Sequence, residues 1–384
     1  MSVPIHRERL ANTFMRLCEI DSPSRQEGEV ADFIKVCLQE LGVDRIVEDH
    51  SGSVTGSNSG NLIASFSGIG SVEEPIFFIC HMDTVEPGCG VEVERNGDVF
   101  TSRGETILGG DDKSGIAVLL EVMRMVTENG LSHRPVELVF TTCEEIGLLG
   151  AKALEYHHMK SEFGYALDST GINRVVVGAP AANSLKITVR GIAAHAGLHP
   201  EEGVSALILA AEAINKLSFG RLDTQSTANL GLIRGGVATN IIPEEIVIKG
   251  EVRSHSEEKL ALHTDNIEKI FQQVIEGCGK RRINGELRPS VEIDVREEYP
   301  LMTCAEDDPV VTHVKRAGER LGRKIEFLAA GGGSDANILN SYGLSTAIIA
   351  TGMTKVHTTD ESQDLGDLVG LAELLYELIA VPAD

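Results

Sequence analysis

The sequence predicts an α/β protein that carries an inserted α+β domain, and three observations support this fold class. Apolar runs typical of buried strands alternate with helix-type spacing in both the first and the last part of the chain. The stretch between these parts has the order β-α-β-β-α-β, which is typical of a ferredoxin-like domain. The 384 residues also exceed the roughly 250 to 300 at which one core stops growing, so we expect two domains.

In the first part of the chain, helix-type and strand-type spacing alternate. Helices are predicted over residues 10–20, 27–41 and 116–127, and strands over residues 61–67, 75–80, 136–142 and 165–167. Residues 91–102 are predicted to form a hairpin, because Asn96-Gly97 favours a two-residue turn.

The inserted domain is expected over residues 181–296. Its predicted strands are residues 184–191, 228–233, 246–253 and 291–295, and its predicted helices are residues 204–217 and 257–276. After it, helices are predicted over residues 308–321 and 365–379 and at the end of the loop 331–335, and strands over residues 325–328 and 345–350. The first domain is therefore expected to be discontinuous, with residues 1–180 and 297–384 forming a mixed sheet flanked by helices.

Charge and composition narrow the classes of partner. The 58 acidic and 34 basic residues give a formal net charge of -24, which opposes binding to nucleic acid or to anionic lipid surfaces. No run approaches the roughly 20 apolar residues that a membrane crossing needs, and we expect a cytoplasmic protein. The seven cysteines show no C-x-x-C spacing, so a disulfide framework is not indicated.

The chain is organised around His81 and Asp83, which follow the predicted strand 75–80. Because residues i and i+2 of a strand point to the same side, both side chains can face one site. A carboxylate beside an imidazole fixes the tautomer and makes the histidine a better metal ligand. Alone, this pair more often marks an ordinary histidine at a strand end, so the interpretation depends on acidic residues further along the chain.

Such residues stand at two later strand ends and at a helix start. Glu144 and Glu145 follow one predicted strand, Asp168 follows the next, and Asp111 opens the helix between them. His357 lies just past the last predicted strand. Two divalent ions need a shared carboxylate and about two terminal ligands each, which is about what these residues supply. Glu144 is then left over as a non-ligating carboxylate that can act as a general base.

The Gly-rich segment 109–115 has a rival interpretation as a phosphate cradle at a helix start. Its two adjacent carboxylates, Asp111 and Asp112, would repel a phosphate, whereas they suit a divalent cation. We therefore favour the metal site.

Taken together, the motifs resemble the dinuclear zinc exopeptidase and amidohydrolase family, and most closely its peptidase T-like members. The resemblance covers essentially the whole chain and rests on His81-x-Asp83, Gly109–Gly115, Glu144-Glu145, Asp168, His357 and the inserted domain. It implies two divalent metal ions, which we expect to be zinc, with cobalt or manganese as alternatives. It further implies that Asp111 bridges the ions, with His81 and Asp168 completing one metal position and Glu145 and His357 the other.

The resemblance also implies roles outside the metal ligands. Asp83 would orient His81, Glu144 would be the base, and the peptide bond after Asp111 would be cis. The inserted domain would be a lid and dimerisation domain. In it, His195 would stabilise the oxyanion, often from the other subunit of a homodimer, and Asn240 and Arg253 would hold the substrate.

These expectations define a two-domain metallohydrolase that cleaves short peptides as an exopeptidase. An N-acyl-amino-acid deacylase using the same site is the alternative, and a non-catalytic metal- or peptide-binding protein or a metal-dependent phosphohydrolase is less favoured. Gly331 stands where the corresponding segment of peptidase T has an arginine. An arginine fork pairs with a terminal carboxylate, so its loss predicts a broader range of substrate lengths than a strict tripeptidase accepts.

Overall fold

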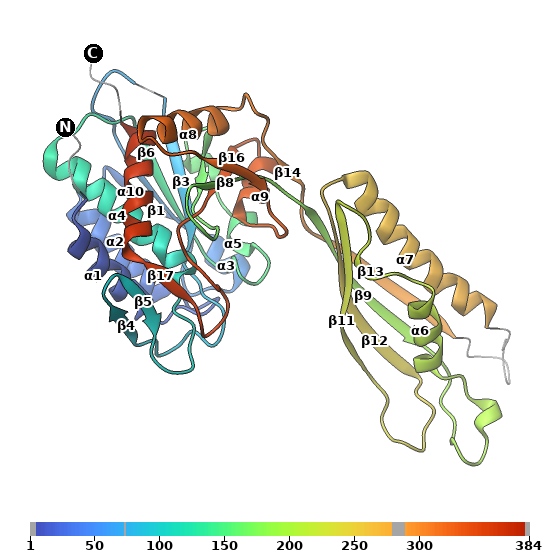
Figure 1. Cartoon of the computed structure of the whole chain (residues 1–384). Coiled ribbons are helices and arrows are strands. Elements are labelled where there is room, and N and C mark those ends of the chain that lie inside the picture. The colour runs from blue at the N-terminus through green and yellow to red at the C-terminus, as the bar shows by residue number, and fades with distance from the viewer. Residues whose placement is uncertain (1–4, 73, 279–288, 381–384) are drawn as a thin grey trace. The chain divides into compact units, whose positions relative to one another are not determined.

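The computed structural model describes residues 5–72, 74–278 and 289–380 and divides into two compact units (Figure 1). The first unit comprises Met1–Gly178 and Met302–Asp384, and the second comprises Ala179–Leu301. Strand β13 (Ser290–Tyr299) extends past residue 296, where the sequence analysis ended the inserted domain.

The first unit is built on a mixed sheet with the strand order β1-β2-β6-β3-β7-β16-β8-β14, and β15 pairs with β8. Its strands are β1 (Arg45–Glu48), β2 (Leu62–Phe66), β3 (Ile76–His81), β6 (Val136–Thr141), β7 (Phe163–Ala166), β8 (Arg174–Ala179), β14 (Met302–Thr303), β15 (Glu326–Ala329) and β16 (Ser345–Ile349). The four neighbours β6, β3, β7 and β16 run parallel, whereas β2 pairs antiparallel with β1 and β6, and β8 pairs antiparallel with β16 and parallel with β15. The carboxyl ends of the four parallel strands therefore meet at one edge of the sheet.

Helices flank this sheet (Figure 1). They are α1 (Arg7–Cys18), α2 (Gly28–Glu40), α3 (Ser51–Thr55), α4 (Gly110–Asn129), α5 (Leu149–Lys152), α8 (Pro309–Arg320), α9 (Asp335–Ser341) and α10 (Leu365–Ile379). Helix α4 contacts β3, α1 and α10, and every residue of β3 and β6 is buried. Complete burial explains the continuous apolar runs that identified these strands in the sequence. A small sheet with the order β17-β5-β4 contains β4 (Val93–Asn96), β5 (Val99–Ser102) and β17 (Ser362–Asp364).

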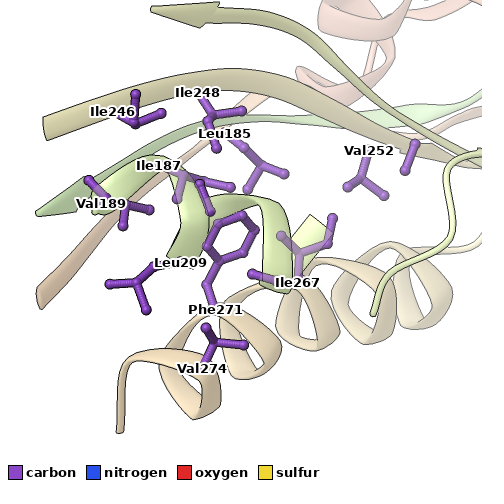
Figure 2. Packing of buried hydrophobic residues seen from close by; sticks show 14 of the residues in the cluster. Leu185, Ile187, Val189, Leu209, Ile246, Ile248, Val252, Ile267, Phe271 and Val274 are labelled. Carbon is purple, nitrogen blue, oxygen red and sulfur yellow. The ribbon is translucent and has the colours of Figure 1, made fainter. Parts of the chain in front are cut away.

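The second unit is an antiparallel sheet with the order β10-β11-β12-β9-β13 and two helices. Its elements are β9 (Ala181–Arg190), α6 (Ala206–Asn215), β10 (Gly220–Arg221), β11 (Ser226–Gly235), β12 (Glu245–Ser254), α7 (Glu257–Gly277) and β13. The long strands follow the ferredoxin-like order, so this part of the predicted fold is confirmed. Figure 2 shows the packing: Leu185 and Ile187 of β9 and Ile248 of β12 lie over Phe271 of α7, and all four are buried.

In the part of the chain that the structure describes, no helix has the length and apolar character that crossing a bilayer requires.

Candidate metal centre

Donor side chains from five parts of the first unit converge where the parallel strands end. His81 is the last residue of β3, Asp168 follows β7, Glu145 follows β6 and His357 follows β16. Asp111 lies in the first turn of α4. Two groups of ligand atoms each lie within 4.8 Å of one another: His81 with Asp111 and Asp168, and Asp111 with Glu145 and His357. The structure thus brings together all five predicted metal ligands.

Asp111 lies between the two imidazoles. Its Oδ1 is 3.2 Å from Nε2 of His81, and its Oδ2 is 3.2 Å from Nε2 of His357. Nε2 of His357 also lies 3.0 Å from Oε1 of Glu145. Because each oxygen of Asp111 faces a different group of donors, this carboxylate is placed to be shared between two cations. The Asp111–Asp112 peptide bond is cis.

Burial and mutual proximity perturb the pKa values of these groups. Burial raises the pKa of Asp168 and that of Glu144 well above the usual carboxyl range, and neighbouring carboxylates add to the shift. Hydrogen bonds to Asp111 and Glu145 raise the pKa of His357 to about 10. For His81, burial opposes the charged form, but Asp111 and the nearby glutamates outweigh it and raise the pKa well above its ordinary value. This cluster of oxygen and imidazole donors suits a divalent cation.

The contact between His81 and Asp83 differs from the expected one. Nδ1 of His81 lies 2.9 Å from the main-chain oxygen of Asp83 and 3.6 Å from its carboxylate. A carbonyl oxygen can only accept, so Nδ1 carries the proton and Nε2 is the atom available for ligation. The backbone of Asp83, rather than its carboxylate, therefore fixes the imidazole, because the chain leaves the strand after His81 and turns the Asp83 side chain toward the end of β6.

The carboxylate of Asp83 instead holds the loop after β6. It accepts the main-chain N–H of Glu144 at 2.9 Å and that of Glu145 at 3.2 Å. Its Oδ2 also accepts the hydroxyl of Ser24 at 2.6 Å. Glu144 is 8% exposed, and its carboxylate lies within 4.8 Å of the donor atoms of His81 and Glu145. The predicted base thus belongs to the same cluster as the predicted ligands.

Two further buried acids adjoin this cluster and were not identified from the sequence. Asp335, at the start of α9, accepts the hydroxyl of Thr141 at 2.5 Å, and burial raises its pKa to about 6. Its other oxygen has no hydrogen-bond partner within the described residues. Glu361 is 1% exposed and accepts three main-chain N–H groups from residues 108–111. Asp335 ends the Gly-rich loop 331–335, and this loop was a signal that could have identified it. Glu361 lies in a polar stretch that resembles a solvated loop, which gave no such signal.

The remaining predicted residues belong to the second unit, where two of the three lie side by side. A β-bridge joins His195 to Ile241, and the N–H of Ala196 donates to the main-chain oxygen of Asn240 at 2.9 Å. Nδ1 of His195 accepts the N–H groups of Gly197 and Leu198, at 3.2 and 3.1 Å. The proton of the neutral ring therefore resides on Nε2, and the side chain is exposed.

Arg253 lies elsewhere in that unit. It stands near the end of β12, paired in register with Ala182 at the start of β9, whereas the loops of His195 and Asn240 adjoin the opposite end of these strands. Its Nη2 lies 2.9 Å from Oε2 of Glu251. Within the second unit, Arg253 is therefore separated from His195 and Asn240.

Comparison with known proteins gives a family match. The family described as Peptidase family M20/M25/M40 matches residues 77–381, which include every residue of the cluster. The chain belongs to this family. As an M20-family protein it is a hydrolytic peptidase, and the predicted resemblance to peptidase T-like exopeptidases is confirmed.

Relatives of this M20 peptidase match it over nearly their full lengths. A protein of Bacillus subtilis (strain 168), called uncharacterized protein YqjE, is 37% identical over 98% of each chain. Among solved structures, aminopeptidase PepT from Bacillus cereus ATCC 10987 has a TM-score of 0.89 and 38% identity, with 98% of each chain covered. A tripeptidase from Staphylococcus aureus subsp. aureus mu50 has a TM-score of 0.91 and 33% identity at the same coverage. The predicted two-part fold is confirmed by these matches.

Proposed function

We propose that this M20 peptidase is an exopeptidase of short peptides that works with two divalent metal ions. The position of Asp111, with one oxygen toward His81 and the other toward His357, carries the proposal. A single buried carboxylate that faces two donor groups is the arrangement that a shared ligand between two ions requires.

The donor set fits two hard or borderline cations such as zinc, cobalt or manganese. In the proposal, His81 and Asp168 hold one ion, Glu145 and His357 hold the other, and Asp111 is shared. When bound, the two ions would polarise the scissile carbonyl and lower the pKa of the attacking water. Nδ1 of His81, fixed on the main-chain oxygen of Asp83, keeps Nε2 directed at the site.

Glu144 is proposed as the general base. It follows β6, is nearly buried, and is held through its main-chain N–H by Asp83. A buried carboxyl with a raised pKa accepts a proton from water more readily than an exposed one. Glu144 would take that proton and then deliver it to the leaving amine.

Short peptides are the proposed substrates because the two solved relatives above are named an aminopeptidase and a tripeptidase. N-acyl amino acids remain the alternative, since the same donors and base would serve that amide bond. The expected cytoplasmic location and the expected absence of a nucleic-acid partner stay predictions.

The second unit is proposed to act as a lid that pairs two copies of the chain. His195 presents an exposed Nε2–H that can donate to an oxyanion, and the neighbouring loop carries Asn240. Strand β10 covers β11 only at Thr227 and Ala228, so residues 230–235 form an edge without a further strand in the described part of the chain. Two residues of α6, Leu207 and Ile208, are exposed apolar side chains beside this sheet.

The test of the activity is a digest of a short-peptide library and of N-acyl amino acids by chelator-treated protein with zinc, cobalt or manganese added back. Metal-dependent removal of terminal residues from peptides is expected. Hydrolysis of the N-acyl amino acids alone would favour the deacylase, and no metal-dependent hydrolysis would overturn the proposal.

The dimer has a separate test. Mixing inactive His195→Ala with inactive Glu144→Ala protein should restore part of the activity if His195 acts on the partner's centre. A monomer by light scattering, or no recovery in subunits shown to exchange, would contradict action across a dimer.

A further inference from the structure

The Gly-rich segment before Asp111 binds an anion, and that anion is a side chain of the same protein. Oε2 of Glu361 accepts the main-chain N–H groups of Leu108 and Gly109, both at 2.9 Å. Its Oε1 accepts the N–H of Asp111 at 3.2 Å. Glu361 is 1% exposed, so these bonds replace water almost completely.

The two glycines make room for this contact. Gly109 has a φ of 77°, in the left-handed region that other residues resist. A Cβ on Gly110 would lie only 3.1 Å from Oε1 of Glu361, which is closer than ordinary van der Waals contact. The segment that the sequence analysis weighed as a phosphate cradle is thus shaped around an internal carboxylate.

Glu361 also belongs to the loop that carries His357. This loop is closed at its base by two main-chain hydrogen bonds between Thr354 and Ser362, at 3.0 and 3.2 Å. His357 itself has a φ of 62° and a side chain that is 48% exposed, so it has little packing of its own to hold it. The buried contact of Glu361 with residues 108–111 ties this loop to the segment that carries Asp111, beside the pairing of Ser362 with Thr101 of β5.

We propose that Glu361 is a positioning residue that sets the separation between His357 and Asp111 and thereby shapes the second metal position. The inference rests on the proposed function. Three N–H donors require both oxygens of a carboxylate, whereas glutamine would place an NH2 group against one of these donors. A buried N–H left without an acceptor is costly, so the loop should shift when the carboxylate is replaced.

Glu361→Gln is the test variant, and Glu137→Gln is its matched control. Glu137 is also buried and accepts the main-chain N–H groups of Lys160 and Ser161, at 3.0 and 2.9 Å, but it lies at the start of β6, away from the donor cluster. Both changes remove one acceptor from a buried carboxylate. Because Oε2 of Glu137 also accepts the N–H of Lys160, at 3.0 Å, glutamine can keep these bonds there, so Glu137→Gln should lower the melting temperature of the metal-free chain less than Glu361→Gln.

Zinc affinity separates the two variants. Chelator-stripped full-length proteins are titrated with Zn²⁺ against a chromophoric competitor, and kcat and KM are then measured on one short peptide. Glu361→Gln should weaken binding of at least one ion by about 10-fold or more, as loss of a group that orients a ligand does. Its kcat should fall while KM stays within about 3-fold, the pattern of lost transition-state stabilisation. Glu137→Gln should match the wild type in both.

Equal zinc affinity in the two variants would overturn the inference, even with a wild type that binds two ions and cleaves peptides. A wild type that binds none of zinc, cobalt and manganese would overturn the proposed function as well. If Glu361→Gln does not fold, Glu361→Asp keeps both oxygens on a shorter side chain and should show intermediate zinc affinity. Wild-type affinity in a folded Glu361→Asp protein would count against a positioning role.

Discussion

Glu144 is tied to Asp83 by a hydrogen bond of 2.9 Å from its main-chain N–H to Oδ1 of that carboxylate. The preceding residue, Cys143, has a φ of 54°, which a residue with a side chain resists, and its N–H donates to Glu27 at 2.9 Å. The main-chain N–H groups of residues 143–145, which follow β6, therefore all donate to buried carboxylates. These acceptors hold the loop that carries Glu144, the proposed base.

Asp83→Asn should lower kcat by about 10-fold or more, because one of two acceptors becomes a donor and the loop carrying Glu144 moves. The unsatisfied N–H should also cost about 1 to 3 kcal/mol of unfolding free energy. Denaturant unfolding and peptide kinetics measure both effects. Asp49→Asn is a suitable control, since the buried Asp49 accepts the N–H groups of Ser51 and Asn61. An equal loss of activity in both variants would contradict the claim that Asp83 supports activity by holding the loop of Glu144.

Glu144→Gln should leave the fold and both metal ions in place while kcat falls by about 100-fold or more, since glutamine fills the same space but cannot take a proton. The metal content, measured by mass spectrometry, should therefore stay at the wild-type level while the activity falls. The distinction matters because Glu144 also lies within 4.8 Å of donor atoms of His81 and Glu145. Loss of metal as complete as in Asp111→Ala would identify Glu144 as a ligand.

The metal-free chain should lose stability as pH rises. The pKa of His357 is raised to about 10, because Asp111 and Glu145 hold its proton, whereas an unfolded histidine releases the proton near about pH 6.5. The folded state thus binds more protons, so this stabilisation is full below about pH 6.5 and is lost as pH rises toward about 10. Melting temperatures in chelator should fall over this range.

His357→Gln supplies the control for this pH dependence. The metal-free variant should show a flatter decline in melting temperature between about pH 6.5 and about pH 10, because it lacks the proton that His357 holds. An identical slope in wild type and variant would contradict the assignment of this proton to His357.

Gly331→Arg should narrow the substrate range. A Cβ at this position meets nothing within 4 Å, so the longer side chain has room. A guanidinium that pairs with a terminal carboxylate adds hydrogen bonds worth about 1.5 to 3 kcal/mol each, so kcat/KM for a tripeptide over its C-terminal amide should rise by about 10-fold or more. Gly331→Met provides similar bulk without charge. A ratio unchanged from the Met variant would show that Gly331 does not face the substrate's end.

Much of the fold could be predicted from sequence because its strands are either fully buried or regularly alternating. The apolar runs that became β3 and β6 are examples, since both faces of these strands are covered. Strand β1 was missed because it is a half-exposed edge strand without a clear pattern. Strand β8 was missed as well, because its Val-rich run ends in Gly178-Ala179, which carries no strand signal.

The donor set could be predicted because metal ligands must be imidazoles and carboxylates, and strand ends concentrate them at one edge. The groups that hold these ligands could not. Glu361 is 253 residues from Leu108 in the sequence. Its carboxylate accepts main-chain N–H groups, which nearly every residue type has, so the contact leaves no pattern in the sequence. Nor could the sequence indicate that the main-chain oxygen of Asp83, at 2.9 Å, would lie closer to Nδ1 of His81 than its carboxylate does, at 3.6 Å.

The position of β16 in the central sheet determines when this sheet can be completed during synthesis. This strand pairs with β7 on one side and with β8 on the other, although it is synthesised after the entire second unit. A chain emerging from the ribosome can fold the second unit first, while the gap between β7 and β8 stays open and His357 and Glu361 do not yet exist. A chain that ends before β16 therefore lacks His357, and its strands β7 and β8 have no β16 to pair with.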